Sequence, residues 1–213
     1  MKKAIFVFAA FAALATACNN APEGETATTA DAQAAAAGTG ATYSIDTTSS
    51  AVEWLGTTPV GQHNGTMKIA KGEFSIAEGN ITAGNFTIDV NSLTNLDMSG
   101  EMEDKLEGHL KSADFFDVAK FPTASFVITG VEPISGDSVA THKISGNLTL
   151  KDSTKNVSFP AQVTVAETGV KASANFNIDR TQWGMFYGND QSLGDKFIRP
   201  EVNIKLNINA NKL

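Results

Sequence analysis

Three histidines and one group of carboxylates are the side chains of this sequence that could ligate a metal ion. His63, His109 and His142 are far apart, and no two of them form a His-x-His or His-x-x-x-His pair, so their spacing does not favour zinc. The acidic residues between Asp97 and Asp117 match no calcium-loop template, and a solvated helix face explains most of them. We therefore predict no metal site and no cofactor.

Motifs for covalent or phosphoryl chemistry are also missing from the sequence. It contains no glycine-rich phosphate loop, no nucleophile elbow and no zinc-protease helix. His109, Asp114 and Asp117 keep a hydrolase or isomerase open as the weakest alternative, because no nucleophile stands at a recognisable spacing from them. We predict that the protein is not an enzyme.

The first 17 residues have the organisation of a secretory signal peptide. Lys2 and Lys3 form a basic start, an uncharged apolar run covers residues 4–15, and small residues lead to Cys18. The apolar run is shorter than the roughly 20 residues that a membrane-spanning helix needs. We predict a signal peptide at residues 1–17.

Cys18 is the only cysteine of the chain, so it cannot form an internal disulfide. Its position after Ala17 resembles the lipobox of bacterial lipoproteins, although Ala15 stands where leucine is usual. The resemblance implies lipidation of Cys18, and stable anchoring needs more than one acyl chain. We expect export across the inner membrane and a periplasmic or outer-membrane-anchored lipoprotein of the cell envelope, in contact with the membrane through its lipidated N-terminus.

The chain is acidic, with a formal net charge of −7 that becomes −9 once the two lysines of the signal peptide are removed. Such a body is repelled by phosphate backbones, which argues against nucleic-acid binding. It also argues against a basic patch on the membrane surface. Solubility is a sufficient explanation for the charge.

Residues 19–41 are rich in Ala, Thr, Glu and Gly and contain no aromatic or large aliphatic side chain. A segment of this composition buries too little apolar surface to offset the entropy lost on ordering. We predict a flexible tether that, together with the lipidated Cys18, covers residues 18–41. One globular domain follows at residues 42–213.

Apolar and polar residues alternate in many short runs from residue 42 onward, as they do in half-buried strands. In the clearest run Val202, Ile204, Leu206 and Ile208 alternate with polar residues. Turn residues separate the runs, as at residues 78–80. We predict an all-β fold in which eight or more strands form a closed antiparallel sheet, because closure removes exposed strand edges.

One segment departs from this alternation. Met102, Leu106 and Leu110 recur every four residues, and Ser99 precedes them at a position that suits an N-cap. We predict the only substantial helix at residues 100–112, where it crosses one mouth or flank of the barrel.

The predicted domain contains ten phenylalanines, since three of the 13 belong to the signal peptide. Phenylalanine brings a large apolar surface without a polar group that needs a partner. Small barrels are either filled by such side chains or hold one ligand among them, and periodicity does not separate the two cases. The residues alone therefore indicate a secreted barrel that is either solid or hollow.

The stretch from His109 to Phe126, HLKSADFFDVAKFPTASF, resembles the signature of the YceI-like polyisoprenoid-binding family. Residues 146–151 (GNLTLK) and 176–184 (FNIDRTQWG) resemble the middle hairpin and a late segment of the same family, and the resemblance covers residues 42–209. It implies an extended antiparallel lipocalin-like β-barrel of about eight strands with one helix. It also implies non-catalytic binding of a long-chain polyisoprenoid, or a similar amphipathic lipid, inside the barrel.

The candidate ligand-binding residues lie on the apolar phase of the predicted strands or near a mouth of the barrel. They are Trp54, Met67, Ile69, Phe74, Phe86, Ile88, Phe116, Phe126, Ile128, Leu148, Phe176, Trp183, Ile204 and Leu206. His109 and Arg180 are candidates for contacting a polar or pyrophosphate head group. The expected partners are an isoprenoid-type lipid and the membrane, with a homodimer left open. The alternative is a structural or interaction lipoprotein whose barrel is solid and binds no ligand.

Overall fold

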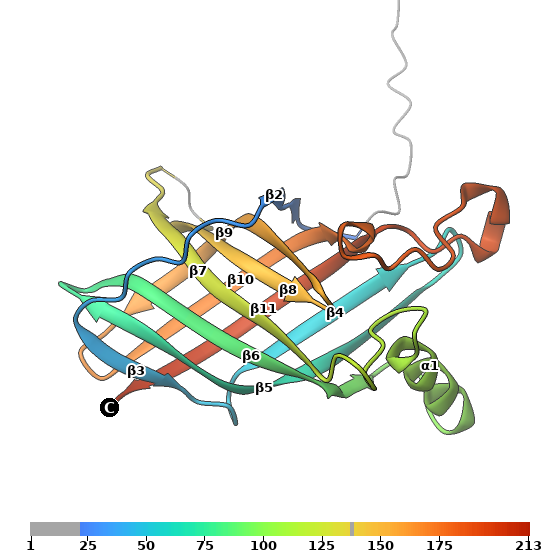
Figure 1. Cartoon of the computed structure of the whole chain (residues 1–213), viewed down its shortest axis with the longest axis horizontal. Coiled ribbons are helices and arrows are strands. Elements are labelled where there is room, and N and C mark those ends of the chain that lie inside the picture. The colour runs from blue at the N-terminus through green and yellow to red at the C-terminus, as the bar shows by residue number, and fades with distance from the viewer. Residues whose placement is uncertain (1–21, 137–138) are drawn as a thin grey trace, which may run out of the picture.

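The computed structural model describes residues 22–136 and 139–213, so the predicted signal peptide and Cys18 lie outside the described residues. Strands make up most of the described chain, and they run obliquely along an elongated barrel (Figure 1). The one α-helix of the described chain, α1 (Glu101–Lys111), lies at one end of the barrel. None of the helices in these two ranges is long and apolar enough to span a membrane.

Eight strand positions close into an antiparallel barrel, as the sequence predicts. Seven of these positions are single strands: β5 (Gln62–Ala77), β6 (Asn80–Asn95), β7 (Thr123–Pro133), β8 (His142–Leu150), β9 (Ser153–Val165), β10 (Gly169–Asp179) and β11 (Glu201–Lys212). The eighth, between β11 and β5, is shared by β3 (Ala41–Ile45) and β4 (Ala51–Thr57). These two strands pair with opposite ends of β11.

The register places the apolar phase of each strand on the inner face of the barrel. Phe126 of β7 lies opposite Phe86 of β6 on one side and Leu148 of β8 on the other. Ile204 of β11 lies opposite Trp54 of β4 and Phe176 of β10. Because side chains alternate between the two faces of a strand, these pairings gather the core inside the barrel.

The predicted flexible tether is wrong for the part of it that the structure describes. β1 (Glu25–Thr26) pairs in parallel with β10, and β2 (Thr28–Asp31) pairs antiparallel with β9. β9 and β10 pair with each other only over residues 161–165 and 170–174. The N-terminal strands therefore occupy the place where β9 and β10 diverge, and they complete the wall there.

Residues 32–40 continue across the outside of the barrel toward β3 (Figure 1). The Asn147 side chain of β8 accepts from the Gln33 N–H at 3.0 Å and donates to the Gln33 carbonyl at 2.7 Å. Thr82 of β6 makes the same two kinds of bond with the backbone of Thr39. These hydrogen bonds from barrel side chains to its backbone hold the segment against the barrel. Amino-acid composition cannot predict such bonds.

The helix is where the sequence predicts it, although its first turn differs in detail. Gly100, with a positive φ of 63°, is the N-cap residue in place of Ser99, and no side chain caps the helix. Glu101, Glu103 and Asp104 in the first turn interact favourably with the positive end of the helix dipole. Leu106 and Leu110, the apolar stripe of the sequence, face the barrel interior.

Candidate ligand-binding cavity

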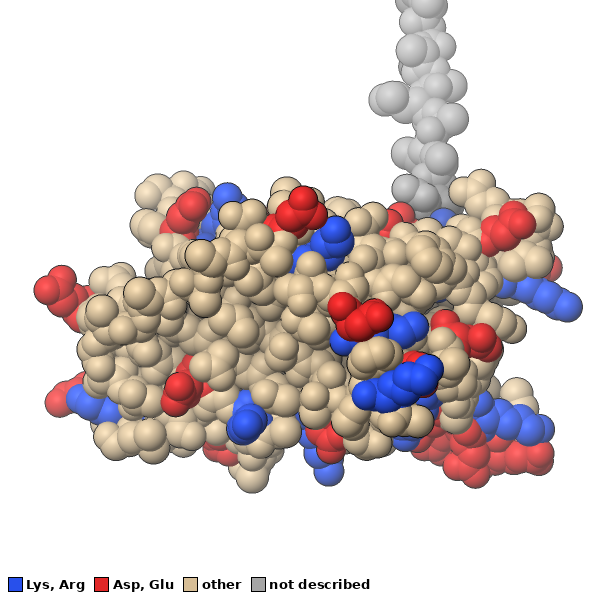
Figure 2. All heavy atoms as spheres, in the orientation of Figure 1, with Lys and Arg blue, Asp and Glu red and all other residues tan. Residues whose placement is uncertain are grey.

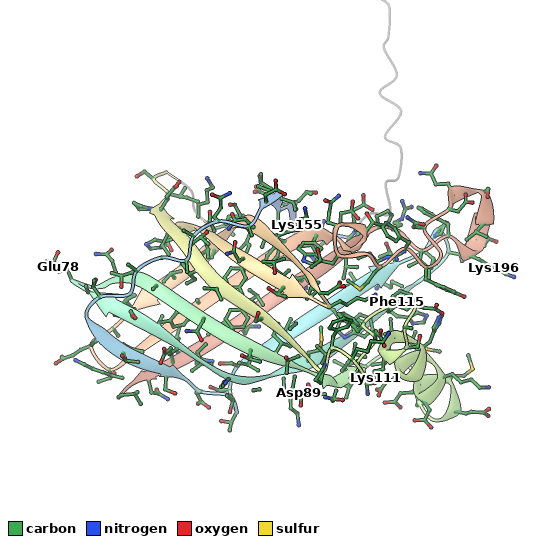
Figure 3. The ribbon with its side chains drawn as sticks, viewed as in Figure 1. Glu78, Asp89, Lys111, Phe115, Lys155 and Lys196 are labelled. Atoms are coloured by element: carbon green, nitrogen blue, oxygen red, sulfur yellow. The ribbon has the colours of Figure 1, made fainter. Side chains whose placement is uncertain are left out.

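An apolar cavity of about 200 Å³ lies inside the barrel at the end that carries α1. Every strand from β4 to β11 contributes to its wall, together with α1 and side chains between residues 180 and 198. In Figure 3 this end of the barrel is marked by Lys111 and Phe115, and the opposite end by Glu78. Ile204 and Leu206 line the cavity and are only half-buried, as expected of inward-facing side chains beside empty space.

Most of the residues that the sequence predicts as lining residues do line this cavity. They are Trp54, Met67, Phe86, Ile88, Phe116, Phe126, Leu148, Phe176, Ile204 and Leu206. Phe74 and Ile128 instead line a second cavity of about 40 Å³ toward the opposite end of the barrel.

Ile69 and Trp183 are buried but line neither cavity. Ile69 is packed in the core, where β5 passes from pairing with β4 to pairing with β3. Trp183 belongs to the short 3-10 helix η1 (Arg180–Trp183), and its indole N–H donates to the Leu148 carbonyl at 3.0 Å. Strand periodicity does not apply to η1, so it gives no information about where Trp183 lies.

A layer of phenylalanines separates the two cavities. Phe86, Phe126 and Phe159 line both of them. The ring centroids of Phe86 and Phe126 are 5.3 Å apart, and those of Phe126 and Phe159 are 5.8 Å apart. Phe176 stacks on Phe159 at 3.9 Å with nearly parallel rings. We call these four residues the phenylalanine partition.

Several lining residues are absent from the candidates of the sequence analysis. Leu106 and Leu110 belong to the apolar helix stripe, and Phe115 belongs to the Asp-Phe-Phe motif. The sequence therefore contained patterns from which these three could have been predicted as lining residues. Phe159 is on the inner phase of β9 and could have been found from alternation. No sequence signal marks Thr57, a polar residue that lines the cavity.

Two histidines face the cavity, and each is paired with an aspartate. His63 Nδ1 lies 2.8 Å from Asp97 Oδ2, and His109 Nε2 lies 3.0 Å from Asp114 Oδ2. Burial tends to raise the pKa of Asp97, but hydrogen bonds from the Asn64 N–H, from His63 and from Asn95 hold that pKa below its usual range. This end of the cavity therefore combines an apolar interior with polar groups.

The three histidines of the chain do not meet in space as metal ligands. His142 hydrogen-bonds Thr141 on β8 and lines neither of the two cavities. Over residues 22–136 and 139–213, no three His, Cys, Asp or Glu side chains are grouped so that they could hold a metal ion.

Arg180 lines the cavity and is 3% exposed. Its guanidinium donates hydrogen bonds to four backbone carbonyls of the following segment, those of Met185, Tyr187, Ile198 and Arg199. It also lies 5.7 Å from the centre of the Phe115 ring. Burial lowers the pKa of Arg180, while the Asp179 carboxylate opposes that shift. Among the described residues no carboxylate forms an ion pair with Arg180, so backbone carbonyls are the hydrogen-bond partners of this positive charge in the wall.

The charged side chains of the outer surface are interspersed (Figure 2). Acidic and basic residues alternate over the visible face without a broad patch of either sign, and many of them gather at the end that carries α1. The ion pairs Lys105–Glu101 and Lys111–Glu107 lie on this helix at 2.7 and 3.3 Å.

Comparison with known proteins yields matches in both sequence and structure. The model of the YceI-like domain matches residues 43–210. Protein YceI of Salmonella arizonae is 38% identical over 99 residues, which are 46% of this chain and 48% of that protein. Protein YceI of Salmonella newport matches to the same extent. The chain thus spans about half the length of the curated relatives it matches.

Two solved structures share the fold. BcnA of Burkholderia cenocepacia has a TM-score of 0.63 at 20% identity, over 78% of this chain and 98% of that one. A polyisoprenoid binding domain from Saccharophagus degradans, implicated in plant cell wall breakdown, has a TM-score of 0.61 at 17% identity, over 80% and 98% of the two chains. At these identities the likeness is one of fold.

Proposed function

We propose a lipid-binding function for this chain, which belongs to the YceI-like domain family. Its barrel holds the apolar chain of a polyisoprenoid, or of a similar amphipathic lipid, and carries out no catalysis. The observation that carries the proposal is the apolar cavity inside the closed barrel, with polar groups at the end next to α1. The shared fold of a polyisoprenoid binding domain supports the ligand class.

The energetics favour an enclosed site for such a ligand. Each CH₂ group withdrawn from water contributes roughly 0.8 kcal/mol, so a prenyl chain gains most where apolar walls surround it. The cavity also favours this function over the alternative of a solid barrel without a ligand. His109 and Arg180 line the same cavity, which supports a role for them in contacting the head group, and Arg180 also donates hydrogen bonds to backbone carbonyls.

Gly56 offers a direct test of the cavity. It lines the cavity, and a Cβ built on it meets no atom within 4 Å. The Gly56→Phe variant should therefore fold and fill the site, while Gly56→Ala adds only a methyl group and serves as the matched control. Thermal melts with geranylgeraniol, a C20 prenyl alcohol, should show a higher Tm for the wild type and for Gly56→Ala but not for Gly56→Phe. An equal rise for all three proteins, or none for the wild type, would contradict the proposal.

We further propose that the protein is an envelope lipoprotein anchored through Cys18. The basic start, the apolar run and the small residues before Cys18 support this. Growth of the source bacterium with radiolabelled palmitate should label the wild-type chain and not the Cys18→Ala variant. A wild-type chain without label would contradict the anchor and leave the cavity proposal untouched.

A further inference from the structure

The phenylalanine partition crosses the interior of the barrel from one wall to the opposite one. Phe126 is the middle ring of the row Phe86, Phe126 and Phe159, and Phe176 extends the row by stacking on Phe159. The first ring of the row comes from β6 and the last from β10, which are four positions apart in a barrel of eight. These two strands therefore lie on opposite sides. Leu206 of β11 also lines both cavities at this level.

A glycine on the neighbouring strand determines where the middle ring lies. Gly146 of β8 pairs with Ile128 of β7, two residues from Phe126. A Cβ built on Gly146 would overlap three atoms of the Phe126 ring. The ring therefore occupies the space that the missing side chain leaves, and its place across the interior is fixed by both strands.

Beyond the partition the barrel is packed as far as its other end, which Glu78 marks in Figure 3. Tyr43 of β3 and Val170 of β10 are buried there in the core. The Tyr43 hydroxyl donates to the Glu167 carbonyl in the β9–β10 turn at 3.0 Å. The two His–Asp pairs that face the large cavity lie at the α1 end instead. A lipid that enters with its head group outermost therefore enters at the α1 end and meets the partition from that side.

Strand β4 gives the depth of the large cavity. Thr57 and Val52 both line it, and Val52 pairs with Leu206 at the level of the partition. The five residues from one to the other span about 17 Å at roughly 3.4 Å per residue, and the tilt of barrel strands makes the depth along the axis smaller. One leaflet of a bilayer has a similar hydrocarbon thickness, half of about 30 Å.

We propose that the partition limits the length of chain that the barrel encloses, so that the protein selects prenyl lipids of about C20 and encloses no more of a C40 chain than of a C20 chain. This rests on the proposed lipid-binding function and names the ligand class within it. The ω-end of the chain, which is the end furthest from the head group, contacts Phe86, Phe126 and Phe159. The carbons of a longer chain stay outside the mouth, where they gain no burial.

The test maps where the chain ends. The probe is a geranylgeraniol analogue with a photoreactive diazirine at its ω-end, which attaches to the nearest side chain on irradiation. Peptide mass spectrometry of the wild type should find the label on Phe86, Phe126 or Phe159. It should find none on Phe74 or Ile128, which line the small cavity alone. An excess of unlabelled geranylgeraniol should suppress the labelling.

A matched pair of variants on β7 tests the partition itself. Phe126→Ala removes the middle ring and should move the label to Ile128 or Phe74. Ile128→Ala removes a side chain of the small cavity on the same inward phase and should leave the label where it is in the wild type. The Kd of the wild type should fall at least tenfold from geraniol, the C10 alcohol, to geranylgeraniol, and less than about threefold from there to a C40 prenyl alcohol.

The outcomes separate this limit from the function on which it rests. Labelling that competition does not suppress, with no measurable Kd for any alcohol, would overturn both. Wild-type label on Phe74 or Ile128, or a Kd that falls as much from C20 to C40 as from C10 to C20, would overturn the limit and leave lipid binding intact. Label on Leu106 or Phe115 would show the reverse orientation and would also overturn the limit. These outcomes are read from the wild type, so they hold even if Phe126→Ala does not fold.

Discussion

Gly146 of β8 illustrates how one residue determines the shape of the cavity. A Cβ at this position would overlap the ring of Phe126, which belongs to the phenylalanine partition. Gly146→Ala should therefore displace that ring and lower the free energy of unfolding by about 1–3 kcal/mol. Urea denaturation measures the change. Gly130→Ala on β7, whose Cβ would meet a single atom at 3.9 Å, is the matched control, and equal stabilities of the two variants would contradict this interpretation.

Asp46 gives a pH dependence whose sign follows from its contacts. Its carboxylate accepts from the hydroxyl and N–H of Thr48 and from the Ser49 hydroxyl, which lowers its pKa from 3.8 to about 2. Because the folded pKa lies below the ordinary value, the contribution to stability is present above about pH 4 and is lost as the pH falls toward 2. The stability difference between the wild type and Asp46→Asn should shrink over that window in acid denaturation experiments. A difference that stays constant from pH 5 to 2 would contradict the lowered pKa.

At the residue scale, alternation in the sequence identified lining residues correctly in most cases, although it did not find the whole cavity wall. It works because inward-facing strand residues must be apolar, as Phe86 and Leu148 show. It fails for Trp183, which lies on a 3-10 helix, and for Thr57, whose side chain is polar.

At the scale of elements, the helix and the long strands follow from the sequence, and the N-terminal strands do not. β1 and β2 are bound by backbone pairing with β10 and β9, so their side chains need no apolar pattern. Ala27 between them is the exception, since it is buried in the core. One small apolar residue in a polar segment is too weak a signal to predict a strand.

Because the N-terminal segment is part of the barrel wall, we predict that aspartate substitutions at Ala27 and at Ala30 change the free energy of unfolding to very different extents. Ala27→Asp places a carboxylate in the core and should lower the free energy of unfolding by on the order of 3 kcal/mol. Ala30→Asp, on an exposed position of β2, should change it by no more than about 0.5 kcal/mol. Urea denaturation of both variants measures this. If both are as stable as the wild type, the segment is not part of the barrel in solution.

At the scale of the whole molecule, the phenylalanine partition divides the barrel into a large and a small cavity. Phe159→Ala should join them, because this ring lines both, at a cost of about 3–5 kcal/mol in stability. The joined space should favour longer chains, so the Kd for a C40 prenyl alcohol should fall relative to that for a C20 one. Phe74→Ala enlarges only the small cavity and is the control. An unchanged ratio in Phe159→Ala would show that the partition does not limit chain length.

The most direct measurement is native mass spectrometry of the protein isolated from its own envelope without detergent. A barrel that holds a lipid should appear with an additional mass that is released on unfolding and identified after extraction as an oxygen-bearing prenyl lipid. Only the mass of the polypeptide with its covalent modifications, together with no uptake of prenyl lipids added afterwards, would contradict a lipid-binding barrel.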